Sequence, residues 1–104
     1  MKHSLDPLLK PASIALVGAS NKPGTPGFIL ADMVINSGFV GTIFPVNPGV
    51  DEVIGRKCYV DIESLPRVVD HIVLALGNQH LEAALKSAIT HGARAVTIYS
   101  SGIL

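Results

Sequence analysis

The chain has 104 residues, of which 48% are apolar and 15% are charged, and its eight basic residues balance its eight acidic residues. This length suits one domain, and the apolar content suits a sheet that is buried on both faces. Without a basic surplus, nucleic acid and anionic membranes are not expected partners, because binding to either depends on neutralising phosphate charge.

The cellular compartment follows from the cysteine count and the N-terminus. Cys58 is the one cysteine and has no internal disulfide partner, which fits a reducing environment. No signal segment opens the chain, and no apolar run approaches the ~20 residues that cross a bilayer. We therefore expect a cytoplasmic protein. Arg56 and Lys57 favour a reactive thiolate at Cys58, whereas the alternative is a buried strand cysteine.

The first half of the chain predicts a strand, a loop, a helix and a second strand. Residues 13–17 form an apolar run that is typical of a buried parallel strand. Residues 19–27 are rich in Gly, Pro, Ser and Asn and predict a loop. A helix is predicted over 28–37 and a second strand over 42–46, where Pro45 weakens the strand or lies near its end.

The second half continues the alternation of strands and helices. Residues 51–58 predict irregular or short-strand structure, and residues 64–66 a brief helical turn. A third strand is predicted over 70–76, an amphipathic helix over 79–91 and a fourth strand over 93–99. This order predicts an α/β fold, namely a Rossmann-like open parallel sheet with helices on both faces, in three layers.

The domain organisation is inferred from the position of the last predicted strand. The chain stops soon after residue 99, without a helix to cover that strand. We expect residues 1–104 to be one domain of a longer protein whose further part lies on the C-terminal side, or a fold that a partner completes. An uncovered strand also favours self-association into a homo-oligomer.

The candidate ligand site lies in the loops that follow the strands, because open parallel sheets bind ligands outside the carboxyl ends of their strands. These loops are residues 18–27, 46–49, 77–80 and 100–102. In the first loop, glycines allow a phosphate to approach the backbone, and the following helix offers unpaired N–H groups. The candidate binding residues of this loop are Gly18, Ala19, Ser20, Lys22, Gly24, Thr25 and Gly27. The alternative is a plain connection in which Thr25 or Ser20 only caps the helix.

Two common nucleotide sites do not fit these loops. The dinucleotide fingerprint would need a glycine at Ser20, and the loop does not contain the Gly-Lys-Ser/Thr of a P-loop. An NAD site also needs an acid at the end of the second strand, where this chain has Val46-Asn47-Pro48 and no acid before Asp51. NAD is therefore disfavoured.

The same residues carry a family resemblance. The stretch Asp-Pro-Leu-Leu-Lys-Pro-Ala-Ser-Ile-Ala-Leu-Val-Gly-Ala-Ser at 6–20 resembles the start of the CoA-binding domain of ADP-forming (NDP-forming) acyl-CoA synthetases, protein acetyltransferases and the succinyl-CoA synthetase alpha subunit. Further matching motifs are Val46-Asn47-Pro48, Glu52-Val53-Ile54-Gly55, Cys58-Tyr59, Ser64-Leu65-Pro66, Val69-Asp70 and Ser101-Gly102.

The resemblance implies which part of coenzyme A each loop would contact. Residues 18–27 would hold its phosphates, Asn47 and Pro48 would lie beside the adenosine, and Gly77 and Asn78 along the pantetheine. Asn78 would then bond a pantetheine amide or, alternatively, cap the helix that starts at Gln79. The family often has a lysine where this chain has Gly49, and Lys22, Arg56 and Lys57 are the candidates to replace its charge.

The resemblance implies a binding role for this segment and catalysis elsewhere. The family's phosphohistidine belongs to a later domain, and His3, His71, His80 and His91 match neither its motif nor the spacing of metal ligands. We therefore expect no catalytic residue and no metal here. The chain would bind coenzyme A as the N-terminal domain of an acid–CoA ligase, together with further domains or a second subunit. The alternatives are a stand-alone CoA- or nucleotide-binding protein and a regulatory module such as that of a protein acetyltransferase.

Overall fold

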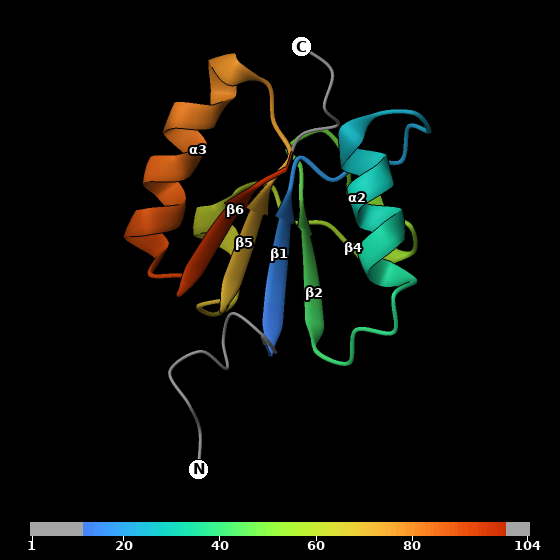
Figure 1. Ribbon diagram of the computed structural model, residues 1–104, viewed down its shortest axis with the longest axis horizontal. Coiled ribbons are helices and arrows are strands. Elements are labelled where there is room, and N and C mark those ends of the chain that lie inside the picture. Colours follow the sequence, from blue (N-terminus) through green and yellow to red (C-terminus); the bar gives the residue numbers. More distant parts are fainter. Residues whose placement is uncertain (1–11, 100–104) are drawn as a thin grey trace.

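Residues 12–99 are described by a computed structural model, in which four parallel strands form a sheet in the order β2-β1-β5-β6 (Figure 1). A separate two-stranded antiparallel sheet consists of β3 and β4. The elements are β1 (Ser13–Val17), α2 (Pro26–Ile35), β2 (Thr42–Val46), β3 (Glu52–Val53), β4 (Arg56–Lys57), the 3₁₀ turn η1 (Ile62–Ser64), β5 (His71–Leu74), α3 (Asn78–His91) and β6 (Ala95–Ile98).

The first strand lies in the middle of the sheet and is buried along its whole length. Ile14 lies opposite Ile43 of β2 on one side and opposite His71 of β5 on the other. A strand that is covered on both faces favours apolar side chains, which explains the apolar run over residues 14–17. The buried hydroxyl of Ser13 accepts a hydrogen bond from the Asp70 N–H at 3.0 Å. Pro45 is accommodated because β2 is an edge strand of the four-stranded sheet. An edge strand has a neighbouring strand of that sheet on one side only, so a residue without an N–H can be tolerated there.

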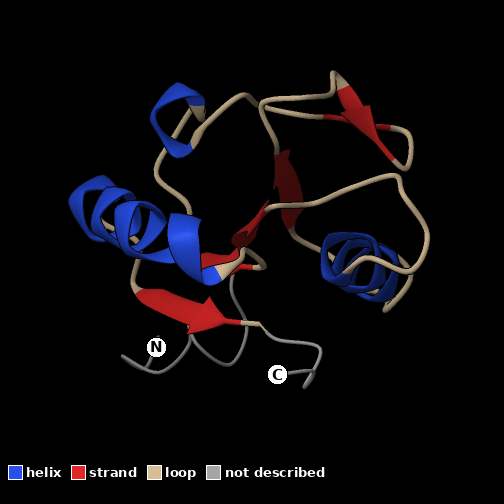
Figure 2. Ribbon diagram, turned by 90° about the horizontal axis from the view of Figure 1, so that it is seen from above, coloured by secondary structure: helices blue, strands red, loops and turns tan. Residues whose placement is uncertain are grey.

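The two helices lie on opposite faces of the sheet, which confirms the predicted three-layer Rossmann-like architecture (Figure 2). On one face, α2 packs its Leu30 and Ala31 into a core cluster with Leu16. On the other face, Ala88 of α3 and Ile62 of η1 share a second cluster with β1 and β5. Alternate residues of each strand therefore supply the two cores.

The helix boundaries differ slightly from the prediction, for reasons of capping. Helix α2 begins at Pro26, two residues early, because the Thr25 hydroxyl accepts from the Phe28 N–H and a proline needs no partner in the first turn. Helix α3 begins at Asn78, and Gly77 holds the N-cap position. Asn78 is therefore the first helical residue, and its alternative role as the cap was wrong.

The remaining segments refine the prediction. The short-strand alternative for residues 51–58 is confirmed as the β3–β4 hairpin, which turns at Ile54 and Gly55, both with positive φ. The helical turn lies at Ile62–Ser64 rather than at 64–66, because the Asp61 carboxylate accepts from the Ser64 N–H and so starts the turn earlier. The loop at 100–102 lies outside the described residues. Between residues 12 and 99, neither helix has the length and apolar character that crossing a bilayer requires.

Candidate functional site

A cavity of about 480 Å³ opens at the carboxyl ends of three strands, on the face that α3 and η1 cover. Its floor is made by the ends of β1, β2 and β5, and its walls by η1 and the first half of α3. The lining residues are Val17, Gly18, Val46, Asn47, Pro48, Val60, Asp61, Ile62, Glu63, Ala75, Leu76, Gly77, His80, Ala83, Ala84 and Ser87. Since β1 is followed by β2 on one side and β5 on the other, this is the point where the strand order reverses, the usual ligand position in such sheets.

Some of the residues predicted from sequence meet in this cavity and others do not. Gly18, Asn47, Pro48 and Gly77 line it. The rest of the first loop, together with Asn78, is not part of the lining: Ala19, Ser20, Lys22, Gly24, Thr25 and Gly27. The first loop therefore lies beside the cavity, between α2 and the carboxyl end of β1 (Figure 1).

Two glycines of this loop are required by the packing of the backbone itself. Gly18 has φ +92°, and a Cβ there would overlap the carbonyl oxygen of Ala75. A Cβ on Gly27, in the first turn of α2, would overlap the carbonyl oxygen of Gly18. These glycines let α2 and β5 approach the end of β1 closely. Gly18 and Gly27, which we predicted to contact the ligand, are thus also required for the packing of the backbone.

Asn47 fastens three segments together at the floor of the cavity. Its Nδ2 donates to the Ala19 carbonyl at 2.8 Å, and its Oδ1 accepts from the Gly49 N–H at 2.8 Å. Its backbone N–H donates to the Tyr59 carbonyl at 2.8 Å. Both ends of the amide are therefore engaged by the protein, so Asn47 shapes the floor through its bonds to the two loops.

Asn21 makes a similar connection between the first loop and the β3–β4 hairpin. Its Nδ2 donates to the Glu52 carbonyl at 2.7 Å, and its Oδ1 accepts from the Ile54 N–H at 2.9 Å. The hairpin is thereby held against the loop although the two are about thirty residues apart in the sequence. The side-chain amides of Asn47 and Asn21 thus hold the first loop against the end of β2 and against the β3–β4 hairpin.

The first loop and the start of α2 both carry backbone N–H groups that could serve as donors. In α2, Phe28 and Ile29 donate to Thr25, and Pro26 has no N–H. Within the loop, Ser20 and Gly24 donate through no backbone N–H bond to another described residue. These N–H groups could donate to an anion beside the loop, as backbone N–H groups do in glycine-bearing phosphate loops.

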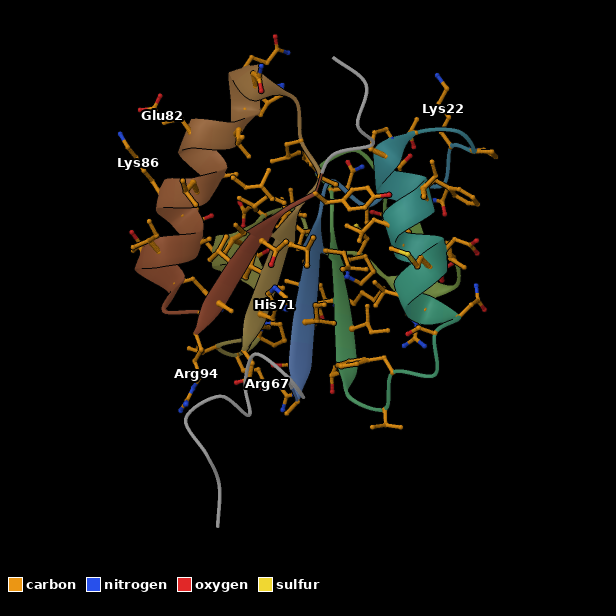
Figure 3. The ribbon with its side chains drawn as sticks, in the orientation of Figure 1. Lys22, Arg67, His71, Glu82, Lys86 and Arg94 are labelled. Atoms are coloured by element: carbon orange, nitrogen blue, oxygen red, sulfur yellow. The ribbon has the colours of Figure 1, made fainter. Side chains whose placement is uncertain are left out.

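Lys22 is the loop's one cationic side chain, and it is exposed. Figure 3 shows it extending outward at the α2 side of the molecule, away from α3. The predicted charge contact of Lys22 to a phosphate would therefore be made on the outer side of the loop.

The wall that η1 provides was not predicted from the sequence. Val60, Asp61 and Glu63 line the cavity, and all three are exposed. The carboxylate of Asp61 accepts from the Ser64 N–H at 2.8 Å. The signal was present, since an Asp three residues before a Ser is a typical cap for a short helical turn. His80 and Ser87 of α3 add polar groups to the opposite wall, and His80 is exposed. Lysine and arginine are absent from the lining formed by the described residues.

Cys58 is buried, and its thiol lies 3.6 Å from the Asn47 carbonyl. Burial raises the pKa of Cys58, which outweighs its hydrogen bonds and keeps the thiol protonated. This supports the alternative of a buried cysteine and not the reactive thiol, although Cys58 lies just after β4 and not in a strand. Within residues 12–99, no three His, Cys, Asp or Glu side chains gather as metal ligands would.

Comparison with known proteins agrees with this geometry. A family model described as a CoA binding domain matches residues 12–103. A trans-feruloyl-CoA synthase from an unknown prokaryotic organism is 38% identical over 100 residues, which are 96% of this chain and 14% of that protein.

Two solved structures show the same fold in chains of different length. A dinucleotide-forming acetyl-coenzyme A synthetase of Ca. Korarchaeum cryptofilum, in complex with phosphate and ADP, superposes with a TM-score of 0.87 at 30% identity. The match covers 95% of this chain and 21% of that one. A conserved hypothetical protein of Pyrococcus furiosus superposes with a TM-score of 0.74 at 36% identity, over 83% of this chain and 72% of that one. The chain thus spans only a small part of the relatives that are named as synthetases.

Proposed function

This chain belongs to the CoA-binding domain family, and we propose that it binds coenzyme A in the cavity at the carboxyl ends of its strands. The observation that carries the proposal is the cavity itself, which lies at the reversal of strand order and has mostly apolar walls with a few polar groups. That composition is typical of sites for cofactors with both apolar and charged parts.

The charge distribution suggests how coenzyme A would lie. Asp61 and Glu63 belong to the lining, and their negative charge disfavours a phosphate inside the cavity. The first loop suits the pyrophosphate, because the N–H groups of Ser20 and Gly24 donate to no backbone carbonyl of the described residues. Gly18 connects the two places, since it is the first residue of the loop after β1 and also lines the cavity.

Calorimetric titration with coenzyme A, 3′-dephospho-coenzyme A and NAD tests the proposal. We expect coenzyme A to bind and NAD to bind weakly or not at all. Ala83→Leu would place a larger side chain at the cavity wall and should weaken coenzyme A binding about tenfold, which corresponds to about 1.4 kcal/mol of binding free energy. Thr90→Leu, on the same helix face two turns away and outside the lining, is the matched control. Absence of coenzyme A binding, or equal loss in both variants, would contradict the proposal.

We further propose that the parent protein is a nucleotide-forming acyl-CoA synthetase in which this domain positions the thiol of coenzyme A for attack on an acyl phosphate. The names of the synthetase relatives support this role. A stand-alone CoA-binding protein is the second candidate, because the Pyrococcus furiosus protein is largely spanned by this fold. The reading frame around the chain decides between them: downstream histidine-bearing and ATP-grasp domains support the synthetase, and an acetyltransferase domain would support protein modification.

A further inference from the structure

The two edges of the main sheet are protected to different degrees. At the β2 edge, Tyr59 forms a backbone bridge with Val46. Its N–H donates to the Pro45 carbonyl at 2.9 Å, and its carbonyl accepts from the Asn47 N–H at 2.8 Å. At the opposite edge lies β6, and residues 12–99 contain no strand that pairs with its outer side. Unpaired N–H and C=O groups on such an edge are a template for another strand.

The backbone of β6 presents two residues to the outside. Ala95 and Tyr99 donate their N–H groups inward, to carbonyls at either end of β5. Because the direction of the backbone groups alternates along a strand, the N–H and C=O groups of Val96 and Ile98 point outward. The strand contains no charged residue and no proline, which are the usual means of guarding an edge. The outer edge of β6 is therefore open to strand pairing.

Exposed apolar side chains accompany this edge on the side of α3. Val96 packs against the core cluster under α3, so Ile98, two residues further along the strand, faces the same side, and it is 52% exposed. Figure 3 shows Glu82 and Lys86 on the outer side of α3, directed away from the rest of the sheet. Ile89 follows Lys86 by three residues and so shares that side of the helix, where it is 66% exposed. An apolar contact surface therefore adjoins the open edge.

A second copy of this chain fits the edge when the two β6 strands run antiparallel about a two-fold axis at Thr97. Val96 of each copy then lies opposite Ile98 of the other, and these pairs exchange the outward N–H···O=C bonds. The exposed Thr97 side chains face each other, which is a favourable cross-strand pair. Ile98 of one copy also comes beside the last turn of α3 in the other, which carries Ile89.

The charges of the chain permit this association. The net charge is zero and β6 carries no charge, so no net repulsion separates two copies. We propose that the outer edge of β6 is the interface of a homodimer in which one continuous sheet runs through both copies. The cavity lining contains no residue of β6, so this interface leaves the cavity of each copy open.

Disulfide formation tests the position of the axis. In Thr97→Cys, the two introduced thiols lie opposite each other in a non-hydrogen-bonded antiparallel pair, where Cα atoms are about 4.5 Å apart and a disulfide can form. Mild oxidation should convert most of this variant into a covalent dimer on a non-reducing gel. Thr90→Cys is the matched control, because Thr90 is exposed and lies two residues from the inward-facing Ala88, on the opposite side of α3. It should stay monomeric on the same gel, and Cys58 is buried in both variants.

A charge exchange at the same position tests the pairing without a covalent bond. Thr97→Lys and Thr97→Glu each place like charges opposite one another, so each variant alone should dimerise about tenfold more weakly in sedimentation equilibrium. An equimolar mixture of the two should recover the association, because the opposed charges then attract. Thr90→Lys and Thr90→Glu should dimerise like the unaltered chain. Circular dichroism checks that every variant is folded.

Other outcomes contradict the inference. An unaltered chain that sediments as a monomer at its highest soluble concentration would overturn the homodimer and leave this edge to a strand from a different protein segment. Equal cross-linking of Thr97→Cys and Thr90→Cys, or a mixture of the two Thr97 charge variants that stays monomeric, would overturn the placement of the interface at β6. None of these results bears on coenzyme A binding, which the calorimetric titration tests separately.

Discussion

Replacement of Asn47 by alanine should lower the free energy of unfolding of the domain, and it should also loosen the floor of the cavity. The substitution removes hydrogen bonds to the Ala19 carbonyl and the Gly49 N–H, both 2.8 Å long. At about 1 kcal/mol net for each bond, the expected loss of unfolding free energy is about 2 kcal/mol. For a domain of this size that corresponds to a fall in Tm of roughly 8–16 °C. Urea unfolding followed by circular dichroism measures the change.

The variant Asn47→Asp separates the two bonds. It keeps an acceptor for Gly49 but places a carboxylate oxygen opposite the Ala19 carbonyl, where only a protonated carboxyl group can donate. Folding should therefore raise the pKa of the introduced carboxyl above its ordinary value of about 3.9. The folded state then binds the proton more tightly, so the stability of this variant relative to the unaltered chain should fall as the pH rises from about 4 to 7. An unchanged urea midpoint in Asn47→Ala, or a pH-independent deficit in Asn47→Asp, would refute the reasoning.

Further predictions concern the helix cap, the glycine contact and a half-buried histidine. Thr25→Ala should destabilise the domain by about 1 kcal/mol through loss of the Phe28 cap, with Thr25→Ser as the control that retains it, in urea unfolding. Gly27→Ala should cost more than Gly24→Ala measured in the same way, even though Gly24 has φ +90°, because only at Gly27 does the added methyl group meet the Gly18 carbonyl. Burial lowers the pKa of His71, so the unfolded state binds more protons and stability should fall as the pH drops through about 6.5. His71→Gln should flatten this part of the pH profile, and an identical slope in both proteins would contradict the assignment.

The sheet was predictable because its signals are local and strong. The apolar runs gave the bounds of β1 and β2 without error, and Gly92, with φ +91°, ends α3 where the pattern indicated. The strand–helix alternation and the family resemblance were likewise confirmed. Helix starts were less predictable, since they depend on which side chain caps the first turn, as Thr25 does for α2.

The site was predictable only in part, because a cavity is a tertiary feature. The rule that ligands lie at the carboxyl ends of strands found Gly18, Asn47 and Gly77. It did not find the η1 wall, because that segment follows no strand of the main sheet and reaches the cavity through the crossover between β2 and β5. Nor did spacing indicate that both amide ends of Asn47 bond to the protein.

The central position of β1 imposes an order on how the chain folds as it leaves the ribosome. Its two neighbours are β2 and β5, so one side of β1 stays unpaired until residue 74 has emerged. At the usual ~5–20 residues per second this interval is a few seconds, during which a mostly apolar strand lacks one of its two neighbouring strands. Nascent chains that end before β5 should therefore remain sensitive to protease, and resistance should appear in one step once β5 and the helix α3 that covers it are available.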